Sequence, residues 1–250
     1  MRERIDMAVF AAAPNFIRLS LRLRVQPSPQ QSDMARDFLR EMSAMAVQNR
    51  VANDPRMAAW RSAYAELGLG PEALPPPEAL LAWAELPQGV PSQGALRDCV
   101  HGYMLCHRLP TAAYDLAAVS GDLWLRPSRG GEHFQGLGDD RPSNPPINEL
   151  ILADSADQVL ARHWHGAQGA ATAGVPNTTD ALVHIDLLPP DAADAARFGG
   201  AFQELAEELL GDRGELRVLG FEQAMVGWEG GLSGSATAGR PDRPPTRRDS

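Results

Sequence analysis

The chain has 250 residues, 44% of them hydrophobic, and a formal net charge of −9 at pH 7. This length and apolar content suffice for one large domain or two small ones with a sizeable core. All 23 basic residues are arginine. The acidic balance argues against a non-specific nucleic-acid binder, because such binding depends on neutralising phosphate charge. We therefore expect no DNA partner, although local arginine contacts to RNA stay open.

The sequence contains no stretch that approaches the ~20 apolar residues of a membrane span. The first residues, MRERIDMAVFAAAPNF, lack the apolar core of a signal peptide. We therefore expect a cytoplasmic protein with no membrane partner. Cys99 and Cys106 would lie roughly 10 Å apart along one helix, too far for a disulfide, so both are predicted to be free thiols.

Strand and helix signals occur together along the whole chain. The clearest strand is 16–25, where apolar residues alternate with Arg18, Ser20, Arg22 and Arg24, and this polar face is expected to be solvated. Helical spacing and capping residues predict helices at 32–46, 54–67, 78–85, 94–106 and 191–210. Further strands are predicted at 122–126, 149–154, 181–187 and 215–221, with a hairpin and loop around Phe134.

The end of the chain differs in composition from the rest. Residues 229–250 are rich in Gly, Ser, Pro and Arg and cannot bury enough apolar surface to order themselves. We predict a single domain over residues 1–228, followed by a flexible tail over 229–250.

The stretch 159–188 carries the most informative pattern. An extended segment at 162–166 is expected to lead into a small-residue loop, a turn at Pro176-Asn177 and the strand 181–187. Within that strand His184 and Asp186 share one face, while the other face is apolar. The polar face could line a ligand cavity or simply meet solvent, and periodicity alone favours solvent.

Common catalytic motifs are missing from the sequence. There is no phosphate loop, G-x-G-x-x-G, G-x-S-x-G or H-E-x-x-H. His163 and His165 form an H-x-H pair, which on a strand would point both imidazoles to one side as half of a metal site. His184 or Asp186 is the only candidate for a third ligand. We therefore expect neither a metal nor a cofactor.

Several segments follow one another in the order of a known family. They are AAWRSAYAELGLGPEAL, PEALLAW, LRDCVHGYMLCHRLPTAAYDLAAVSGDLWLRPSRGGEHFQGLG, NELILADSADQVLARHW and TTDALVHID. Together they resemble, over about residues 16–210, the stand-alone form of the B3/B4 domain of the phenylalanyl-tRNA synthetase β subunit. The resemblance is carried by an ordered series: Trp60-Arg61, Asp98, Pro110, Tyr114-Asp115, Arg126, Glu132, Glu149, Asp154, Trp164 and Thr178.

The resemblance implies a fold and an activity. The fold would be α+β, a B3/B4-type mixed fold with a β-sandwich-like core and packed helices. In the synthetase this domain edits, by hydrolysing the ester of tyrosine wrongly attached to the tRNA. The implied partner is the 3′ end of an aminoacyl-tRNA. The implied substrate-binding residues are Gln168, Thr178, Asp98, Glu149, Trp164 and His165.

This chain departs from the family inside the pocket. The editing histidine falls on Ala112, the glutamate that reads the substrate side chain falls on His184, and an asparagine of the 94–106 helix falls on His101. A cavity-loop glycine falls near Gln168. An arginine before that helix falls near Pro91, and a Trp-Arg pair becomes Gly166-Ala167. The resemblance therefore predicts an inherited scaffold with an altered interior.

Hydrolysis of an activated ester needs a positioned water, a donor for the developing oxyanion and a base. We predict His184 as the base, oriented by Asp186, with His101, Gln168 or loop N–H groups as donors. His184, Asp186, Thr178 and Gln168 are then expected to converge on one cavity. Activity should fall as pH drops through the pKa of His184, near ~6.5 if unperturbed, and His184→Ala should slow release.

Three functions fit these residues. The first is a trans-acting aminoacyl-tRNA deacylase. The second is a tRNA-dependent aminoacyltransferase of specialised metabolism, which passes the aminoacyl group to a small-molecule nucleophile such as an amine or hydroxylamine. The third is a non-catalytic binder of tRNA or of an amino acid derivative. The sequence leaves the amino acid, the tRNA and the oligomeric state open.

Overall fold

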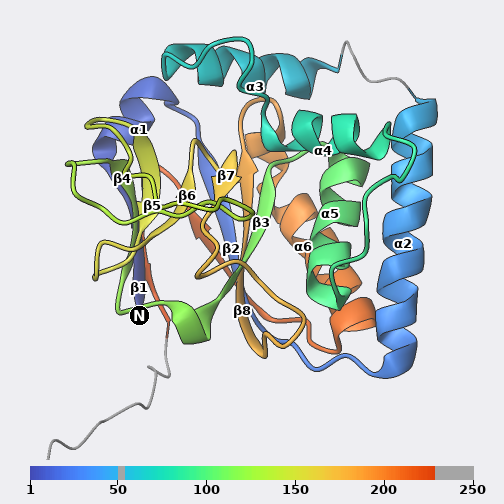
Figure 1. Cartoon of the computed structure of the whole chain (residues 1–250). Helices are drawn as coiled ribbons and strands as arrows, with labels where there is room; N and C mark the ends of the chain where they lie inside the picture. Colours follow the sequence, from blue (N-terminus) through green and yellow to red (C-terminus); the bar gives the residue numbers. More distant parts are fainter. Residues whose placement is uncertain (50–53, 229–250) are drawn as a thin grey trace, which may run out of the picture.

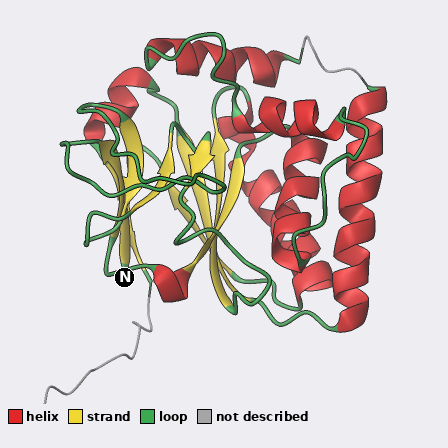
Figure 2. Cartoon of the chain, in the orientation of Figure 1, coloured by secondary structure: helices red, strands yellow, loops and turns green. Residues whose placement is uncertain are grey.

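The computed structural model describes residues 1–49 and 54–228, which fold into two sheets and a layer of helices (Figures 1 and 2). One sheet has six strands, in the order β10 (Met225–Gly227), β1 (Arg2–Ile5), β4 (Leu123–Pro127), β5 (Leu150–Ala153), β6 (Val159–Arg162) and β7 (Ala167–Gln168). The other has four strands, in the order β3 (Thr111–Asp115), β8 (Asp180–Leu187), β2 (Ile17–Arg24) and β9 (Glu215–Leu219). The predicted tail lies outside the described residues.

The two sheets pack face to face, and the helices cover the other side of the four-stranded sheet. On β8, Leu182 belongs to the apolar cluster between the sheets, whereas Val183 and Ile185 belong to the cluster beneath the helices. This alternation follows from the period of two along a strand. The predicted α+β fold with a sandwich-like core and packed helices is therefore confirmed.

The helices fall into two groups (Figure 1). The helices α5 (Ala95–His107) and α6 (Ala195–Leu210) lie against the four-stranded sheet, and the long helix α2 (Pro29–Gln48) packs on their outer side. The others are α1 (Met7–Ala12), α3 (Pro55–Glu66), α4 (Pro76–Ala84) and the short 3-10 turns η1 (Leu116–Ala118) and η2 (Asp191–Asp194). In the part of the chain that the structure describes, no helix is long and apolar enough to cross a membrane.

The observed helix N-termini show how well capping residues predict where a helix begins. The start at Asp54-Pro55 is confirmed, and the Asp54 side chain accepts a hydrogen bond from the Arg56 N–H. The preceding helix was expected to start at Ser32 or Asp33 but begins at Pro29. Ser28 caps it instead, in a reciprocal capping box with Gln31. A proline at the first helical position adds to that earlier signal.

The polar face of β2 is solvated only toward its end, where Arg24 is exposed, whereas periodicity predicted solvent along the whole face. Arg18 and Ser20 are fully buried between the sheets. Arg18 binds Asp186, and the Ser20 hydroxyl donates to the Glu3 carboxylate at 2.6 Å. The second sheet covers this face, so each buried polar group needs a partner within the protein.

The segment 162–166 is not extended. β6 ends at Arg162, and His163, Trp164 and His165 have φ values of 50°, 47° and 69°. The Tyr64 hydroxyl donates to the His163 carbonyl at 2.6 Å and holds this left-handed turn. The two histidines therefore do not project from one strand face, and no group of three or more His, Cys, Asp or Glu residues in the described ranges could hold a metal ion.

Candidate functional site

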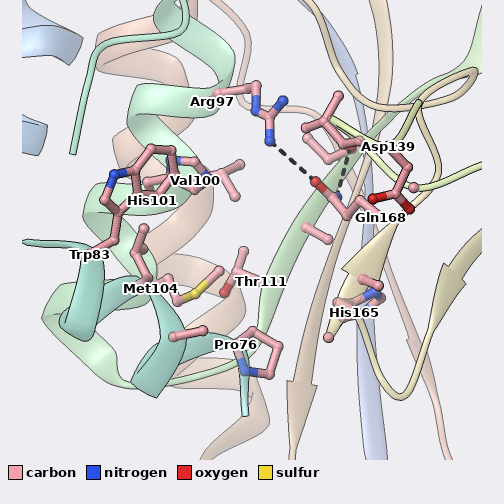
Figure 3. Close-up of a pocket in the computed structure, with 18 residues that line it drawn as sticks. Pro76, Trp83, Arg97, Val100, His101, Met104, Thr111, Asp139, His165 and Gln168 are labelled. Atoms are coloured by element: carbon pink, nitrogen blue, oxygen red, sulfur yellow. Dashed lines mark hydrogen bonds between the residues drawn. The ribbon is translucent and has the colours of Figure 1, made fainter. Parts of the chain in front are cut away.

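A cavity of about 350 Å³ opens where α4, α5, β3, the loop 136–139 and the segment 165–168 meet (Figure 3). Pro76, Leu80 and Trp83 of α4 and Met104 of α5 give it an apolar wall. Its polar lining comes from α5 itself, from β3, and from the loops and the short strand β7 on the other side of the cavity. The polar residues are Arg97, His101, Thr111, Asp139, His165 and Gln168.

Arg97 and His101 occupy the same face of α5 because they are four residues apart on a helix. The Arg97 Nη2 donates to Gln168 Oε1 at 3.4 Å, and the Gln168 Nε2 donates to the Ala113 carbonyl at 3.5 Å (Figure 3). No carboxylate of the described residues lies within ion-pair distance of Arg97. Burial lowers the pKa of its guanidinium. Arg97 thus brings an uncompensated positive charge to the cavity.

His101 is a neutral imidazole with a free ring nitrogen. Burial, and then the charge of Arg97, lowers the pKa of His101 to about 4. Its Nδ1 is buried and has no hydrogen-bond partner among the described residues. A neutral imidazole with an unbonded nitrogen can accept a proton or a hydrogen bond. The unpartnered Nδ1 is enclosed by protein, so a water molecule can reach the ring only at Nε2. Through Nε2, His101 is the side chain in this cavity best able to act as a base.

His165 lines the cavity, but both of its ring nitrogens are engaged. The Nε2 lies 3.0 Å from the Asp186 carboxylate, and the Nδ1 lies within hydrogen-bond distance of the Tyr114 hydroxyl. Burial lowers the pKa of His165 to about 4, with Asp186 opposing this effect. The neutral ring donates from Nε2 to Asp186 and accepts at Nδ1 from Tyr114. His165 is thereby held as a fixed part of the wall.

Behind His165 a polar cluster continues between the two sheets. Arg18 and Asp186 form a bidentate pair, with N–O distances of 2.7 and 2.8 Å, and both side chains are fully buried. Burial alone would raise the pKa of Asp186, but Arg18 and His165 hold it well below its usual range. We call Glu3, Arg18, His184 and Asp186, together with His165, the inter-sheet network.

His184 lies inside this network and does not line the cavity. Its side chain is fully enclosed, with Nε2 2.9 Å from Glu3 Oε1 and the Tyr114 ring centroid 5.3 Å away. The predicted convergence of four residues on one cavity is therefore wrong, since only Gln168 of the four lines it. The reason is topological, because β8 is an inner strand whose polar face is covered by the second sheet.

Thr178 and Asp98 form hydrogen bonds that hold the loops next to them, and they do not face the cavity. The Thr178 hydroxyl donates to Asp115 Oδ2 and accepts from the Val175 N–H, both at 3.0 Å. The Asp98 carboxylate accepts from the Gln93 N–H at 2.8 Å. In these positions both side chains are engaged with the protein itself and do not line the cavity.

Glu149 and Trp164 hold the turn that presents His165. Glu149 pairs with Arg162 and with the His163 imidazole, whose Nε2 is 3.2 Å away. Despite partial burial, which alone would raise it, these partners lower the pKa of Glu149 to about 2. Trp164 packs edge-on against Trp60, with ring centroids 5.8 Å apart. Both residues act on the cavity through the turn.

Sequence reasoning missed Arg97 and Asp139 of the cavity, and Glu3 and Arg18 of the network. The four-residue spacing of Arg97 and His101 within a predicted helix was the signal available for the first. Glu3 belongs to a strand of four residues, which is too short for a periodic pattern. Asp139 lies in a loop, where sequence gives no direction to a side chain.

Comparison with known proteins places this architecture in a family. The model of the B3/4 domain matches residues 59–203. The chain belongs to the B3/4 domain family. Every residue that lines the cavity lies within the matched range, whereas β1 and β2, which supply Glu3 and Arg18, precede it.

The chain also has a distant structural match among solved proteins. The chain is similar to an N-terminal fragment of the phenylalanyl-tRNA synthetase β-subunit from Pyrococcus horikoshii, with 12% identity and a TM-score of 0.38. The match covers 51% of this chain and 43% of that fragment, so the chain spans less than half of the fragment's length. No curated protein matches the chain.

Proposed function

We propose that this B3/4 domain protein hydrolyses the ester of an aminoacyl-tRNA, acting in trans on the charged 3′ end. The observation that carries the proposal is the side-by-side placement, in one cavity, of Arg97 with Gln168 and of the neutral His101. The cavity volume of about 350 Å³ is at the small end for ligand pockets, which suits a single amino acid.

Arg97 and Gln168 are suited to stabilise negative charge. The guanidinium has five N–H donors, and one contact to Gln168 leaves others free for an oxyanion. Because the two side chains are already fixed to each other, little reorganisation is needed as charge develops on the ester oxygen. Asp139 at the rim can pair with the α-ammonium group, and Trp83 and Leu80 can contact the side chain.

His101 would serve as the base. It takes a proton from a water molecule whose oxygen attacks the ester carbonyl carbon and forms a tetrahedral intermediate. The intermediate collapses, the bond from the carbonyl carbon to the ribose oxygen breaks, and the imidazolium returns its proton to that oxygen. The products are a free amino acid and an uncharged tRNA.

The attacking group must come from solution. In the part of the chain that the structure describes, no Ser, Cys or Lys side chain lines the cavity. The Thr111 hydroxyl is committed to the Leu109 carbonyl at 2.9 Å. This favours a second candidate, an aminoacyltransferase in which a small amine or hydroxylamine replaces water.

The test is release of labelled amino acid from a panel of charged tRNAs by the purified protein. Arg97→Gln and His101→Asn should each slow release, while Arg36→Gln, an exposed substitution on α2, serves as the matched control. Absence of release from every charged tRNA would remove the deacylase. Product that requires both hydroxylamine and the protein, above the reaction of hydroxylamine alone, would establish the transferase, and saturable binding without turnover would establish a binder.

A second variant separates the cavity from the inter-sheet network. Because His184 is enclosed beside Glu3, His184→Ala should lower stability, whereas the rate per folded molecule should be retained. A fall in kcat with unchanged stability would instead return His184 to a direct role in catalysis.

A further inference from the structure

A second cluster of side chains lies toward the opposite edge of the six-stranded sheet from the cavity. Arg4 of β1 and Trp124 of β4 are cross-strand neighbours, and Arg129 follows β4. They line a hollow of about 390 Å³. We call Arg4, Trp124 and Arg129 the arginine–tryptophan patch.

Two arginines of the patch have no carboxylate partner. Most arginines of the described residues form ion pairs. Within the described ranges, the arginines with no ion pair are Arg4, Arg97, Arg129 and Arg141. One of these lies in the cavity and two lie in the patch. Two of these four arginines therefore lie together in the patch, where no carboxylate of the described residues binds their guanidinium groups.

The carboxylates that line the same hollow are already occupied. Asp122 binds the Arg2 backbone and side chain, with the closest contacts at 2.7 Å. Asp157 pairs with Arg126 at 3.0 Å. Asp154 accepts backbone N–H groups, including that of Ser120 at 2.8 Å. The donors of Arg4 and Arg129 are therefore not diverted to these acids.

The indole fixes the orientation of the two guanidinium groups. The Arg4 Cζ lies 3.5 Å from the Trp124 ring centroid, and the Arg129 Cζ lies 4.8 Å from it. A guanidinium on an aromatic ring keeps its N–H edge free, and that edge matches the oxygens of a phosphate. Both arginines are exposed and Trp124 is partly exposed. Because guanidinium groups cover the ring, the patch offers N–H edges suited to backbone phosphate rather than a bare aromatic face for base stacking.

We propose that the arginine–tryptophan patch binds the sugar-phosphate backbone of the RNA whose charged end enters the cavity. This inference rests on the proposed function. Three strand-to-strand steps separate β4 from β7 at the cavity, roughly 14 Å across the sheet. An RNA that spans this width contacts the protein at two places, with phosphate held at the patch and the ester held at Arg97.

The test measures the affinity of deacylated bulk tRNA by fluorescence anisotropy at several salt concentrations. The double variant Arg4→Gln/Arg129→Gln should bind about tenfold more weakly and reduce the slope of log affinity against log salt by about 1 to 2. The matched control is Arg36→Gln/Arg40→Gln, which removes two exposed, ion-paired arginines of α2 on the far side of the molecule (Figure 1). It should change affinity less than twofold.

Two further measurements decide between outcomes. Trp124→Leu should also weaken binding, since it removes the ring that orients both arginines. Equal affinities for the patch variant, the control and the wild type would overturn the inference, while amino acid release sensitive to Arg97 would leave the proposed function standing. Conversely, the patch variant could bind tRNA more weakly while neither it nor the wild type releases amino acid. That result would support RNA binding by the patch and would exclude the proposed deacylase activity. Equally tight, patch-dependent binding of duplex DNA would overturn the assignment to RNA.

Discussion

The inter-sheet network and the cavity group of Arg97, His101 and Gln168 contain similar side chains in different surroundings. In the network, Arg18 meets Asp186 in a bidentate pair and His184 meets Glu3, all enclosed between the sheets. In the cavity, Arg97 has no acidic partner among the described residues and His101 keeps an unbonded nitrogen. The network also contains buried polar atoms without a hydrogen bond among the described residues, including Arg18 Nη1 and His184 Nδ1. The difference therefore lies in charge pairing, because enclosed ion pairs position one another, whereas a charge without an ion pair beside a hollow is available to a ligand.

From this comparison we expect the largest loss of folding stability when Asp186 is replaced. Asp186→Asn removes the carboxylate that pairs directly with the buried Arg18 guanidinium and leaves only the more distant charge of Glu3, which should lower the free energy of unfolding by about 3 to 5 kcal/mol. Urea denaturation measures this loss. Asp33→Asn breaks an exposed pair on α2 and should change little. Equal stability of the two variants would show that the buried pair is not a stabilising unit.

In the cavity the expected effect is on rate. Arg97→Gln should reduce kcat for ester hydrolysis roughly a hundredfold, about 2.7 kcal/mol, because one oxyanion donor is lost. The unfolding free energy should stay nearly constant, since Arg97 contributes a single long hydrogen bond of 3.4 Å to the fold. Single-turnover kinetics and urea denaturation of the same preparation separate the two quantities. A loss of stability without a loss of rate would place Arg97 with the network.

Burial of His165 makes stability depend on pH. Its pKa falls from an ordinary value of about 6.5 to about 4 in the folded protein. Between these values the unfolded chain binds more protons, so His165 alone should contribute a loss of stability of about 2 kcal/mol from pH 7 to pH 5. Asp186 and Glu149 have lowered pKa values and add to the loss only nearer and below pH 4.

Denaturation at several pH values tests this dependence, with His165→Gln as the variant and His133→Gln, at an exposed position, as the control. Glutamine at 165 can still donate to Asp186, so the variant should reduce the slope while the control keeps it. Burial also lowers the pKa of His101 and of His107 to about 4, so part of the dependence should persist in the variant. An unchanged slope in His165→Gln would contradict the assignment.

The smallest expected effect is on the pH profile of hydrolysis. A base with a pKa of about 4 is already deprotonated above pH 5, so enzymatic release corrected for the uncatalysed rate should be nearly constant between pH 5 and 8. It should fall only as pH approaches 4. Steady-state release across this range provides the measurement. A decrease centred near 6.5 would point to a different, less buried base.

Much of the fold followed from local patterns. The alternation of β2, the Asp54-Pro55 start of α3 and the two faces of β8 were readable because strand period, capping and helix spacing are properties of neighbouring residues. The strands β1, β3, β6, β7 and β10 were not predicted. They have two to five residues each, too few for a clear periodic pattern, and the partners of β1 and β3 are distant in the chain.

The candidate site was only partly predictable. His101, His165 and Gln168 were named from the sequence and do line the cavity. His184 and Asp186 were given the right shared face and the wrong exposure, because alternation places a side chain on a face without saying what covers that face. Here a six-stranded sheet covers it, and the segment that presents His165 is a turn stabilised by Tyr64 from another element.

By itself the sequence determined the α+β class, the periodic faces and a family resemblance, since each depends on residue order within a segment. Only the tertiary structure decided which charges are enclosed as pairs and which face a hollow. That choice depends on which segments meet in space, as when α5 and β7 bring Arg97 to Gln168 while β1 and β8 bring Glu3 to His184.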